Sequence, residues 1–359
     1  MNRITSQNVA PADIRMLKSL IEGSNRIVVL CHQAPDGDAV GSSLALANVM
    51  KNMQKHVCVI TPDAPQKSLM KLPHAREILV ASHKTEAAQY FISAADLIVL
   101  LDLNDLKRID RVGPLVEASK APRIVIDHHE GPDIKADLIF SSPSSSSTCE
   151  LLYELLESAE WLEHLDSEGA TDIYCGMMTD TGNFSYNSNN PRLYHIIASL
   201  IERGIDKDDI YKKVWNVSSA SRLRLCGHAL SSKMELLPEL HGAILSLSCD
   251  DLTTHGYVRG DTEGLVNQPL AIPGIVWSVF LREDEPGYIK VSMRSQGDFA
   301  VNEICHTCFG GGGHVNAAGG ELRDSSLAEA IDKIKEVMND HRHLLPPDLP
   351  RVIDNKIQK

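Results

Sequence analysis

The chain has 359 residues, enough for two domains that each bury a core. Its formal net charge of −13 at pH 7 argues against binding to long nucleic acid, because duplex affinity comes mainly from Lys and Arg that neutralise phosphates. The eight cysteines have no spacing typical of a disulfide framework, which favours a reducing compartment. Because the sequence shows neither a signal peptide nor an apolar stretch of the roughly 18 residues that a membrane span needs, we expect a cytoplasmic protein.

Five apolar runs in the first half of the chain are typical of buried β-strands. They lie at residues 26–31, 55–61, 96–101, 123–126 and 137–141, after an amphipathic helix expected within residues 1–23 and before a helix expected at 147–159. The segments between the runs have helical or loop character. This alternation predicts the α/β fold class, with a doubly wound parallel sheet in the N-terminal domain.

The second half of the chain predicts a helical connector and a smaller α/β domain. Residues 206–237 are expected to be mostly helical, and the acidic stretch 206–209 suits a helix N-terminus. Strands are then expected at 242–248, 275–281 and 288–293, followed by a short helix, a glycine run and an amphipathic helix at 326–339. We therefore expect domains at 1–205 and 241–345, a connector at 206–240 and a loose tail at 346–359.

Acids and histidines follow several of the expected strands. His32, Asp36 and Asp38 come after the first strand, Asp102 after the third, Asp127, His128 and His129 after the fourth, and Asp180 further along. Because the functional crevice of an open parallel sheet lies beyond the carboxyl ends of its strands, we expect these side chains to converge. Several carboxylates can share one crevice only if cations neutralise them. The pattern therefore predicts a cluster of metal ions.

The loop after the first strand offers carboxylates where a phosphate-binding loop would offer backbone N–H groups. Pro35 and Gly37 should bend the chain so that the flanking acids and His32 point toward one volume. A metal is then expected between protein and phosphate. Mixed imidazole and carboxylate ligands favour manganese, iron, cobalt or zinc over magnesium alone. Taken alone, the loop would favour an acidic turn with a capping Asp, and this alternative loses weight only when Asp102, the triplet at 127–129 and Asp180 are considered with it.

A second interpretation of this loop is an aspartyl nucleophile. The sequence Asp36-Gly37-Asp38-Ala39-Val40 fits the signature of haloacid-dehalogenase-type phosphatases, in which the first Asp is phosphorylated. That family places the Asp directly at the strand end, whereas Asp36 lies five residues past Cys31. This alternative also leaves His32, His128 and His129 without a role, so we rank it below the metal cluster.

Taken together, these residues resemble the DHH-family phosphoesterases, named for the triplet found here as Asp127-His128-His129. The resemblance covers most of residues 20–340 and includes the first-strand loop, Asp102 and the sequence Thr179-Asp180-Thr181-Gly182 with Phe184. Residues 309–319 resemble the DHH-associated C-terminal domain. The two-domain layout is most similar to the nanoRNase and pAp-phosphatase group. We expect neither the extra nucleic-acid-binding domain of RecJ-type exonucleases nor the transmembrane modules of cyclic-dinucleotide hydrolases.

The resemblance implies a site for two divalent ions, usually manganese. One ion would be held by His32, Asp36 and Asp102, and the other by Asp38, Asp102, His128 and Asp180, so that Asp102 bridges them. A water activated by both ions would attack phosphorus, and His129 would contact the phosphoryl group. Asp127 would be a further ligand or, as we favour, an outer residue that orients one.

Local departures from the family pattern affect the identity of the ligand near residue 102 and the substrate preference. Leu103 stands where a small polar residue is expected, and Arg108-Ile109-Asp110 stands in place of an Arg-hydrophobic-Gly step. Asp105 is therefore an alternative ligand to Asp102, although Asp102 lies directly at the strand end and is preferred. Residues 130–132 lack an Asn often seen after the triplet, which affects substrate preference more than chemistry.

In the second domain, a glycine run and an arginine are expected to bind the rest of the substrate. Gly311, Gly312 and Gly313 can expose successive N–H groups as an anion-binding nest ahead of a helix, and His314 can add a hydrogen bond. Arg294 and Ser295 follow a strand and can bind the same phosphate. The structural alternative is a tight turn in which glycines let two backbones pack closely.

The sequence therefore predicts a metal-dependent phosphoesterase with its active site in a cleft between the two domains. The expected substrates are short oligoribonucleotides or the 3′-phosphate of adenosine bisphosphate, with no membrane or long duplex as partner; a homodimer is compatible with the sequence. Hydrolysis of cyclic or linear dinucleotides is a second enzymatic interpretation. A nucleotide-binding module without turnover is a third, which the intact ligand set disfavours.

Overall fold

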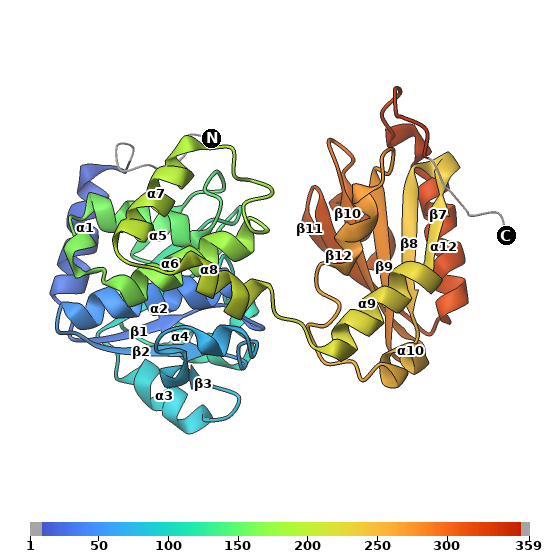
Figure 1. Ribbon diagram of the computed structural model, residues 1–359. Helices are drawn as coiled ribbons and strands as arrows, with labels where there is room; N and C mark the ends of the chain where they lie inside the picture. Colours follow the sequence, from blue (N-terminus) through green and yellow to red (C-terminus); the bar gives the residue numbers. More distant parts are fainter. Residues whose placement is uncertain (1–8, 353–359) are drawn as a thin grey trace. The chain divides into compact units, whose positions relative to one another are not determined.

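The computed structural model describes residues 9–352, in which the chain forms two compact units (Figure 1). The first ends at Val217 and the second begins at Ser218, and each has its own sheet and hydrophobic core. The segment 206–240, expected as a helical connector, is divided between the two units.

The N-terminal unit is built on a six-stranded parallel sheet with the order β3-β2-β1-β4-β5-β6. Its strands are β1 (Arg26–Leu30), β2 (His56–Thr61), β3 (Leu79–Val80), β4 (Leu97–Leu101), β5 (Arg123–Asp127) and β6 (Leu138–Ser141). This confirms the predicted doubly wound fold, with the two-residue β3 as an addition. The strand order runs outward in both directions from β1 and β4, which makes this pair the topological switch point.

Helices cover both faces of this sheet (Figure 1). One face packs against α1 (Pro11–Glu22), α2 (Gly37–Asn52) and α5 (Thr148–Ser158), and the other against α3 (Thr85–Ser93) and α4 (Gly113–Ala118). The helices α6 (Ser167–Asp180) and α7 (Pro191–Glu202) extend the first layer by packing on α2 and α5. The unit ends with α8 (Lys207–Ile210) and a π-helical turn, Tyr211–Trp215. Short 3-10 helices lie at Leu69–Lys71, Ala75–Glu77, Leu106–Val112 and Leu162–His164.

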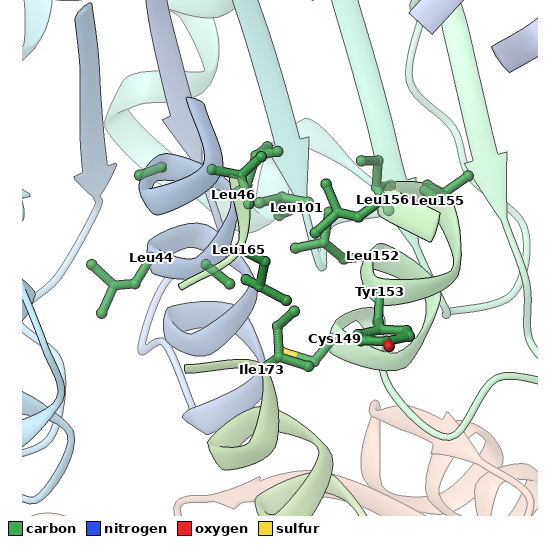
Figure 2. Close-up of a cluster of buried hydrophobic side chains, with 14 of the residues drawn as sticks. Leu44, Leu46, Leu101, Cys149, Leu152, Tyr153, Leu155, Leu156, Leu165 and Ile173 are labelled. Carbon is green, nitrogen blue, oxygen red and sulfur yellow. The ribbon is translucent and has the colours of Figure 1, made fainter. Parts of the chain in front are cut away.

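The strands are apolar throughout because both of their faces are covered. In β4, Leu97, Val99 and Leu101 point into the core beneath α2 and α5, while Ile98 and Leu100 point into the core beneath α3. Figure 2 shows Leu101 among leucines of α2 and α5. This double burial fixes the strand ends, and with them the residues that follow.

Two glycines allow α2 and α6 to approach each other closely. A Cβ at Gly41 would lie 2.5 Å from the carbonyl oxygen of Asp172, and a Cβ at Gly176 would lie 2.8 Å from Oδ1 of Asp38. Real Cβ atoms do not make contacts this short. Glycine at position 176 therefore allows Asp38 to lie against α6, the helix that ends at Asp180.

The C-terminal unit has a six-stranded sheet with the order β11-β12-β10-β9-β8-β7, in which β8 and β9 are parallel and the other pairs antiparallel. The strands are β7 (Met234–Leu237), β8 (Gly242–Leu247), β9 (Trp277–Glu285), β10 (Tyr288–Ser295), β11 (Gly312–His314) and β12 (Ala317–Arg323). The helices are α9 (Ala220–Ser232), α10 (Cys249–Thr254), α11 (Val301–Phe309) and α12 (Leu327–Asp340), with 3-10 helices at Pro238–Leu240, Leu265–Ala271 and Arg342–Leu344. The predicted second α/β domain is confirmed, and β7 replaces the end of the expected connector helix.

The glycine run does not precede a helix as the sequence analysis expected. Gly310 ends α11 with a φ of 61°, and the following residues form the edge strand β11. A Cβ at Gly311 would lie 1.8 Å from the carbonyl oxygen of Gly319, so these glycines let β11 and β12 pack closely. The run thus has the structural role of a tight turn and edge strand. The prediction of an anion-binding nest ahead of a helix is wrong.

The segment expected as a loose tail lies against the core of this unit as far as it is described. Leu349 packs against the core and Val352 is 5% exposed. Residues 353–359 lie outside the described residues. In the part of the chain that the structure describes, we find no helix with the length and apolar character that crossing a membrane requires.

Candidate metal centre

The acids and histidines predicted from the N-terminal unit come together at one edge of its sheet. β1 pairs with β4 and β4 with β5, all in parallel, so the residues that follow these strands leave the same edge. Three groups of side chains bring ligand atoms within 4.8 Å of one another: His32 with Asp36 and Asp102, Asp38 with His128 and Asp180, and Asp102 with His128 and His129. The first two groups contain the residues expected around the two ions.

Asp102 lies at the centre of these groups. It follows β4, is 2% exposed and has a φ of 57°, a left-handed conformation that Asp adopts more readily than most residues. Its Oδ2 lies 3.3 Å from Nε2 of His32, and its Oδ1 lies 3.7 Å from Nε2 of His128. The two carboxylate oxygens thus face the two groups, which is the arrangement that a bridging ligand needs.

Backbone groups that follow β1 orient the side chains of His32 and Asp36 in the first group. Nδ1 of His32 lies 2.7 Å from the carbonyl oxygen of Gln33. Because a carbonyl only accepts, Nδ1 carries the hydrogen and Nε2 faces Asp102 and, at 3.7 Å, Oδ2 of Asp36. Oδ1 of Asp36 caps α2 by accepting from the amides of Asp38 and Ala39. Asp36 therefore combines the capping role with a second oxygen that faces His32.

The second group joins three elements of the unit. Asp38 lies in the first turn of α2, His128 follows β5, and Asp180 ends α6. Nε2 of His128 lies 3.4 Å from Oδ2 of Asp180 and 3.9 Å from Oδ2 of Asp38. Nδ1 of His128 points toward the carbonyl oxygen of Ser145 at 3.5 Å. The histidine thus presents one ring nitrogen to two carboxylates.

His129 has a different partner from His128. Its Nδ1 lies 2.7 Å from Oδ1 of Asp127, and 3.4 Å from Oδ1 of Asp102. Asp127 is fully buried, and the residue is absent from the three groups above. Asp127 therefore orients His129 directly, whereas the sequence analysis favoured orientation of a metal ligand.

The electrostatics of the centre fit divalent cations. Burial raises the pKa of Asp38 to about 7, with the charge of Asp102 adding to the effect. Burial also raises the pKa of Asp180, which lies at the negative end of the α6 dipole. Burial would lower the pKa values of His32 and His128, but neighbouring carboxylates raise them to about 10 and about 9. A divalent ion would replace the protons that otherwise balance these carboxylates.

The sequence analysis missed the contribution of the N-terminus of α5. The amides of Thr148 and Cys149 donate to the two oxygens of Asp38, and the hydroxyl of Thr148 donates to Asp102. The available signal was the segment 141–148, in which every residue except Pro143 is Ser or Thr, between a strand end and a helix start. Asp105, the alternative to Asp102, caps a 3-10 helix at Lys107 and belongs to none of the three groups.

In the C-terminal unit, two of the expected substrate-binding residues lie on one face of the sheet. Arg294 pairs with Ala317, and Ala317 pairs with His314, so all three side chains leave the same face of β10, β12 and β11. Arg294 and His314 are thus two strand spacings apart, roughly 10 Å. Ser295 points to the other face, is 7% exposed and donates its hydroxyl hydrogen to the carbonyl oxygen of Phe299. This internal bond disfavours Ser295 as a donor to substrate.

Comparison with known proteins places this site in a family. A profile of the DHH family N-terminal domain matches residues 26–177, and a profile of the DHHA1 domain matches residues 244–340. A Thermus thermophilus protein named bifunctional oligoribonuclease and PAP phosphatase is 30% identical over 316 residues, which are 88% of this chain and 89% of that protein. The chain belongs to the DHH family. It is a phosphoesterase, and the resemblance drawn from its motifs is confirmed.

Two further relatives show the range of this DHH-family similarity. The crystal structure of an exopolyphosphatase-related protein from Bacteroides fragilis matches at 41% identity with a TM-score of 0.91, over 94% of this chain and 98% of that one. A cyclic-di-AMP phosphodiesterase of Geobacillus thermodenitrificans is 25% identical over 90% of this chain. The chain spans about half of that enzyme, 49% of its length.

Proposed function

We propose that this DHH-family phosphoesterase hydrolyses short oligoribonucleotides and the 3′-phosphate of adenosine 3′,5′-bisphosphate (pAp). The observation that carries the proposal is the pair of ligand groups that meet at Asp102, since each offers imidazole and carboxylate donors. The similarity to a protein named for both activities, over most of both chains, supports this choice of substrates.

Two divalent cations, for which we propose Mn²⁺, would supply Lewis-acid activation of a water molecule and of the phosphoryl group. His32 and Asp36 would hold one ion, Asp38, His128 and Asp180 the other, and Asp102 both. The imidazoles favour manganese over magnesium, because magnesium prefers oxygen ligands and near-ideal octahedral geometry.

The remaining residues of the DHH triplet would act on the substrate itself. Asp127 binds Nδ1 of His129 at 2.7 Å and so fixes the ring orientation. His129 would then use its other nitrogen to contact the phosphoryl group and stabilise the charge that develops there.

We further propose that the C-terminal unit binds the part of the substrate that does not react. Arg294 and His314 share one face of the sheet, and the short side chain of Ala317 lies between them in the register. A guanidinium and an imidazole in this arrangement suit a phosphate or a terminal nucleotide. Gly311 donates its amide to the carbonyl oxygen of Cys305, so of the three predicted glycines only Gly312 and Gly313 would remain to contribute N–H groups from the edge strand β11.

Hydrolysis of cyclic or linear dinucleotides is the second candidate. It is favoured by the similarity to a cyclic-di-AMP phosphodiesterase over 90% of this chain. The same metal centre could cleave either substrate, because the reacting group is a phosphate ester in both. A binding module without turnover has no evident need for a carboxylate placed between two ligand groups.

An activity panel in Mn²⁺ distinguishes these candidates. The substrates are pAp, linear pApA, cyclic di-AMP, pentanucleotides and long single strands, each as RNA and, where applicable, DNA. We expect pAp and the shortest RNAs to be hydrolysed and the rate to fall steeply with length. The Asp102→Asn protein, purified in parallel, controls for a contaminating nuclease. Efficient cleavage of long strands, or a strong preference for cyclic di-AMP, would contradict the proposal.

A further inference from the structure

The N-terminus of helix α5 donates hydrogen bonds to a carboxylate from a different helix. The amide of Thr148 donates to Oδ2 of Asp38 at 2.6 Å, and the amide of Cys149 donates to Oδ1 at 2.9 Å. The first N–H groups of a helix have no partner inside that helix. Here they bind both oxygens of Asp38, which lies on α2, and leave the remaining lone pairs of this carboxylate for another ligand.

The side chain of Thr148 contacts a second carboxylate of the same centre. Its hydroxyl donates to Oδ1 of Asp102 at 3.1 Å, and both residues are buried. This is the oxygen that lies 3.7 Å from His128, whereas Oδ2 faces His32. The terminal torsion of an Asp side chain is otherwise broad. A hydroxyl bonded to Oδ1, with Nδ1 of His129 at 3.4 Å from the same oxygen, therefore favours the orientation in which Oδ2 faces His32.

The position of Thr148 is set by hydrogen bonds at the start of α5. Ser147 caps α5 by accepting from the amide of Glu150 at 3.0 Å, and a carboxylate oxygen of Glu150 accepts from the amide of Ser146 at 2.7 Å. All four residues are buried. This reciprocal cap fixes the start of α5, so that the amide and hydroxyl of Thr148 are already aligned with the two carboxylates.

We propose that Thr148 is a positioning residue that holds Asp38 and Asp102 in the mutual orientation required for two metal ions to share Asp102. This inference rests on the two-metal function proposed above. Thr148 would touch neither ion nor substrate. Its amide would fix Asp38 beside the second ion, and its hydroxyl would keep the Asp102 carboxylate turned toward both groups.

The test compares Thr148→Val with Thr148→Ser. Valine keeps the backbone amide and the branched shape but removes the hydroxyl, whereas serine keeps the hydroxyl. Mn²⁺ is titrated into each metal-free protein by calorimetry, and the electron paramagnetic resonance spectrum is followed for the signature of a coupled manganese pair. We expect the valine variant to bind the pair about 10- to 100-fold more weakly, as is typical when an outer partner of a metal ligand is lost. The serine variant should recover the affinity and the coupled spectrum.

Two controls keep the outcome specific. Thr171→Val makes the same change at a threonine whose hydroxyl donates to Ser167 within α6, and should leave manganese binding unchanged. Urea unfolding of the metal-free proteins checks that the valine variant is folded. A folded Thr148→Val protein with wild-type affinity and spectrum would overturn the positioning role alone. A wild-type protein that binds no coupled pair would overturn the two-metal proposal, and the role of Thr148 with it.

Discussion

Buried carboxylates have opposite environments in the two units. In the C-terminal unit, Asp251 accepts from the amide of Ser248 at 3.0 Å and is paired with His228 at 2.8 Å and Lys233 at 2.9 Å. Although burial opposes this, these donors hold the pKa of Asp251 well below its usual range. In the N-terminal unit, burial and the neighbouring Asp102 raise the pKa of Asp38 to about 7.

This difference separates acids that stabilise the fold from acids that need a ligand. Asp251 has enough protein donors to remain charged without help, and its capping role in α10 explains why it is buried. Asp38 and Asp180 lie near other carboxylates, so their negative charges add. We therefore expect substitutions in the first class to change stability and substitutions in the second to change metal binding and turnover.

The largest effect is expected at Asp102, the residue that we propose as the ligand shared by two ions. Asp102→Asn should abolish turnover and lower the bound manganese, because both ions lose a charged ligand, while the fold is retained. The measurements are steady-state rates on pAp, metal content and circular dichroism. Asp105→Asn is the matched control, since Asp105 lies on the same loop outside the ligand groups. Near-normal activity of Asp102→Asn with full metal content would show that the bridging assignment is wrong.

Removal of the metal should also eliminate activity. Adding back each ion separately should then show which one restores turnover best. Chelation by EDTA is expected to inactivate the protein, and Mn²⁺ should restore turnover better than Mg²⁺ because of the imidazoles of His32 and His128. Rates after dialysis and titration with each ion provide the measurement. Full activity in excess EDTA, together with phosphorylated Asp36 detected by mass spectrometry, would favour the aspartyl-nucleophile alternative.

The contrast between the units also explains which features the sequence could predict. The apolar strands β1, β4 and β5 were predictable because burial on both faces makes their sequences continuously apolar. The residues that follow them were then placed together by the geometry of a parallel sheet alone. This is why His32, Asp102 and His128 could be grouped from a single sequence.

Other features depended on pairings that side-chain patterns do not encode. Thr148 binds Asp38 through its backbone amide. Because nearly every residue carries such an amide, the residue type at position 148 does not indicate this contact. The sequence of the run Gly310–Gly313 is compatible with a nest or with an edge strand. In the structure, β12 approaches these glycines closely and pairs with β11, so the run forms an edge strand. The stabilising role of Asp251 likewise depends on donors from Ser248, His228 and Lys233, which the sequence does not show to be its partners.

A third prediction concerns the face of the C-terminal sheet that carries Arg294 and His314. If Arg294 and His314 bind the non-reacting part of the substrate, Arg294→Ala and His314→Ala should each cost about 2 to 4 kcal/mol in transition-state stabilisation on pAp, typical of a charge-assisted contact left unpaired. Hydrolysis of bis-p-nitrophenyl phosphate should change much less, because this ester has no second phosphate to bind. Rates on both substrates give the comparison.

The control for this prediction lies on the same strand. Lys290 is on the same face of β10 as Arg294, four residues away, and pairs with Asp284. Lys290→Ala should therefore leave the ratio of the two rates unchanged. An equal loss on pAp and on the small ester for Arg294→Ala would indicate that this residue acts on the metal centre and not on the substrate.

The smallest effect is expected at Asp251, where the comparison predicts a change in stability without a change in metal binding. The folded pKa of Asp251 lies below its ordinary value of 3.8, so its contribution is present above that pH and is lost as the pH falls through 3.8 toward the folded pKa. Asp251→Asn should lower the free energy of unfolding by about 1 to 2 kcal/mol at neutral pH, through loss of the cap and of charged partners. The free energy of unfolding of this variant should also fall less than that of the wild-type protein between neutral and acid pH.

Hydrogen exchange of the α10 amides and urea unfolding between acid and neutral pH provide the measurements. Asp250→Asn removes the same charge from an exposed position of the same helix, and should change stability by less than about 0.5 kcal/mol. Manganese affinity should stay at the wild-type value in both variants, because neither residue lies in the ligand groups. If Asp251→Asn instead weakened metal binding while leaving the α10 amides protected, the division between fold-stabilising and ligand-requiring acids would fail.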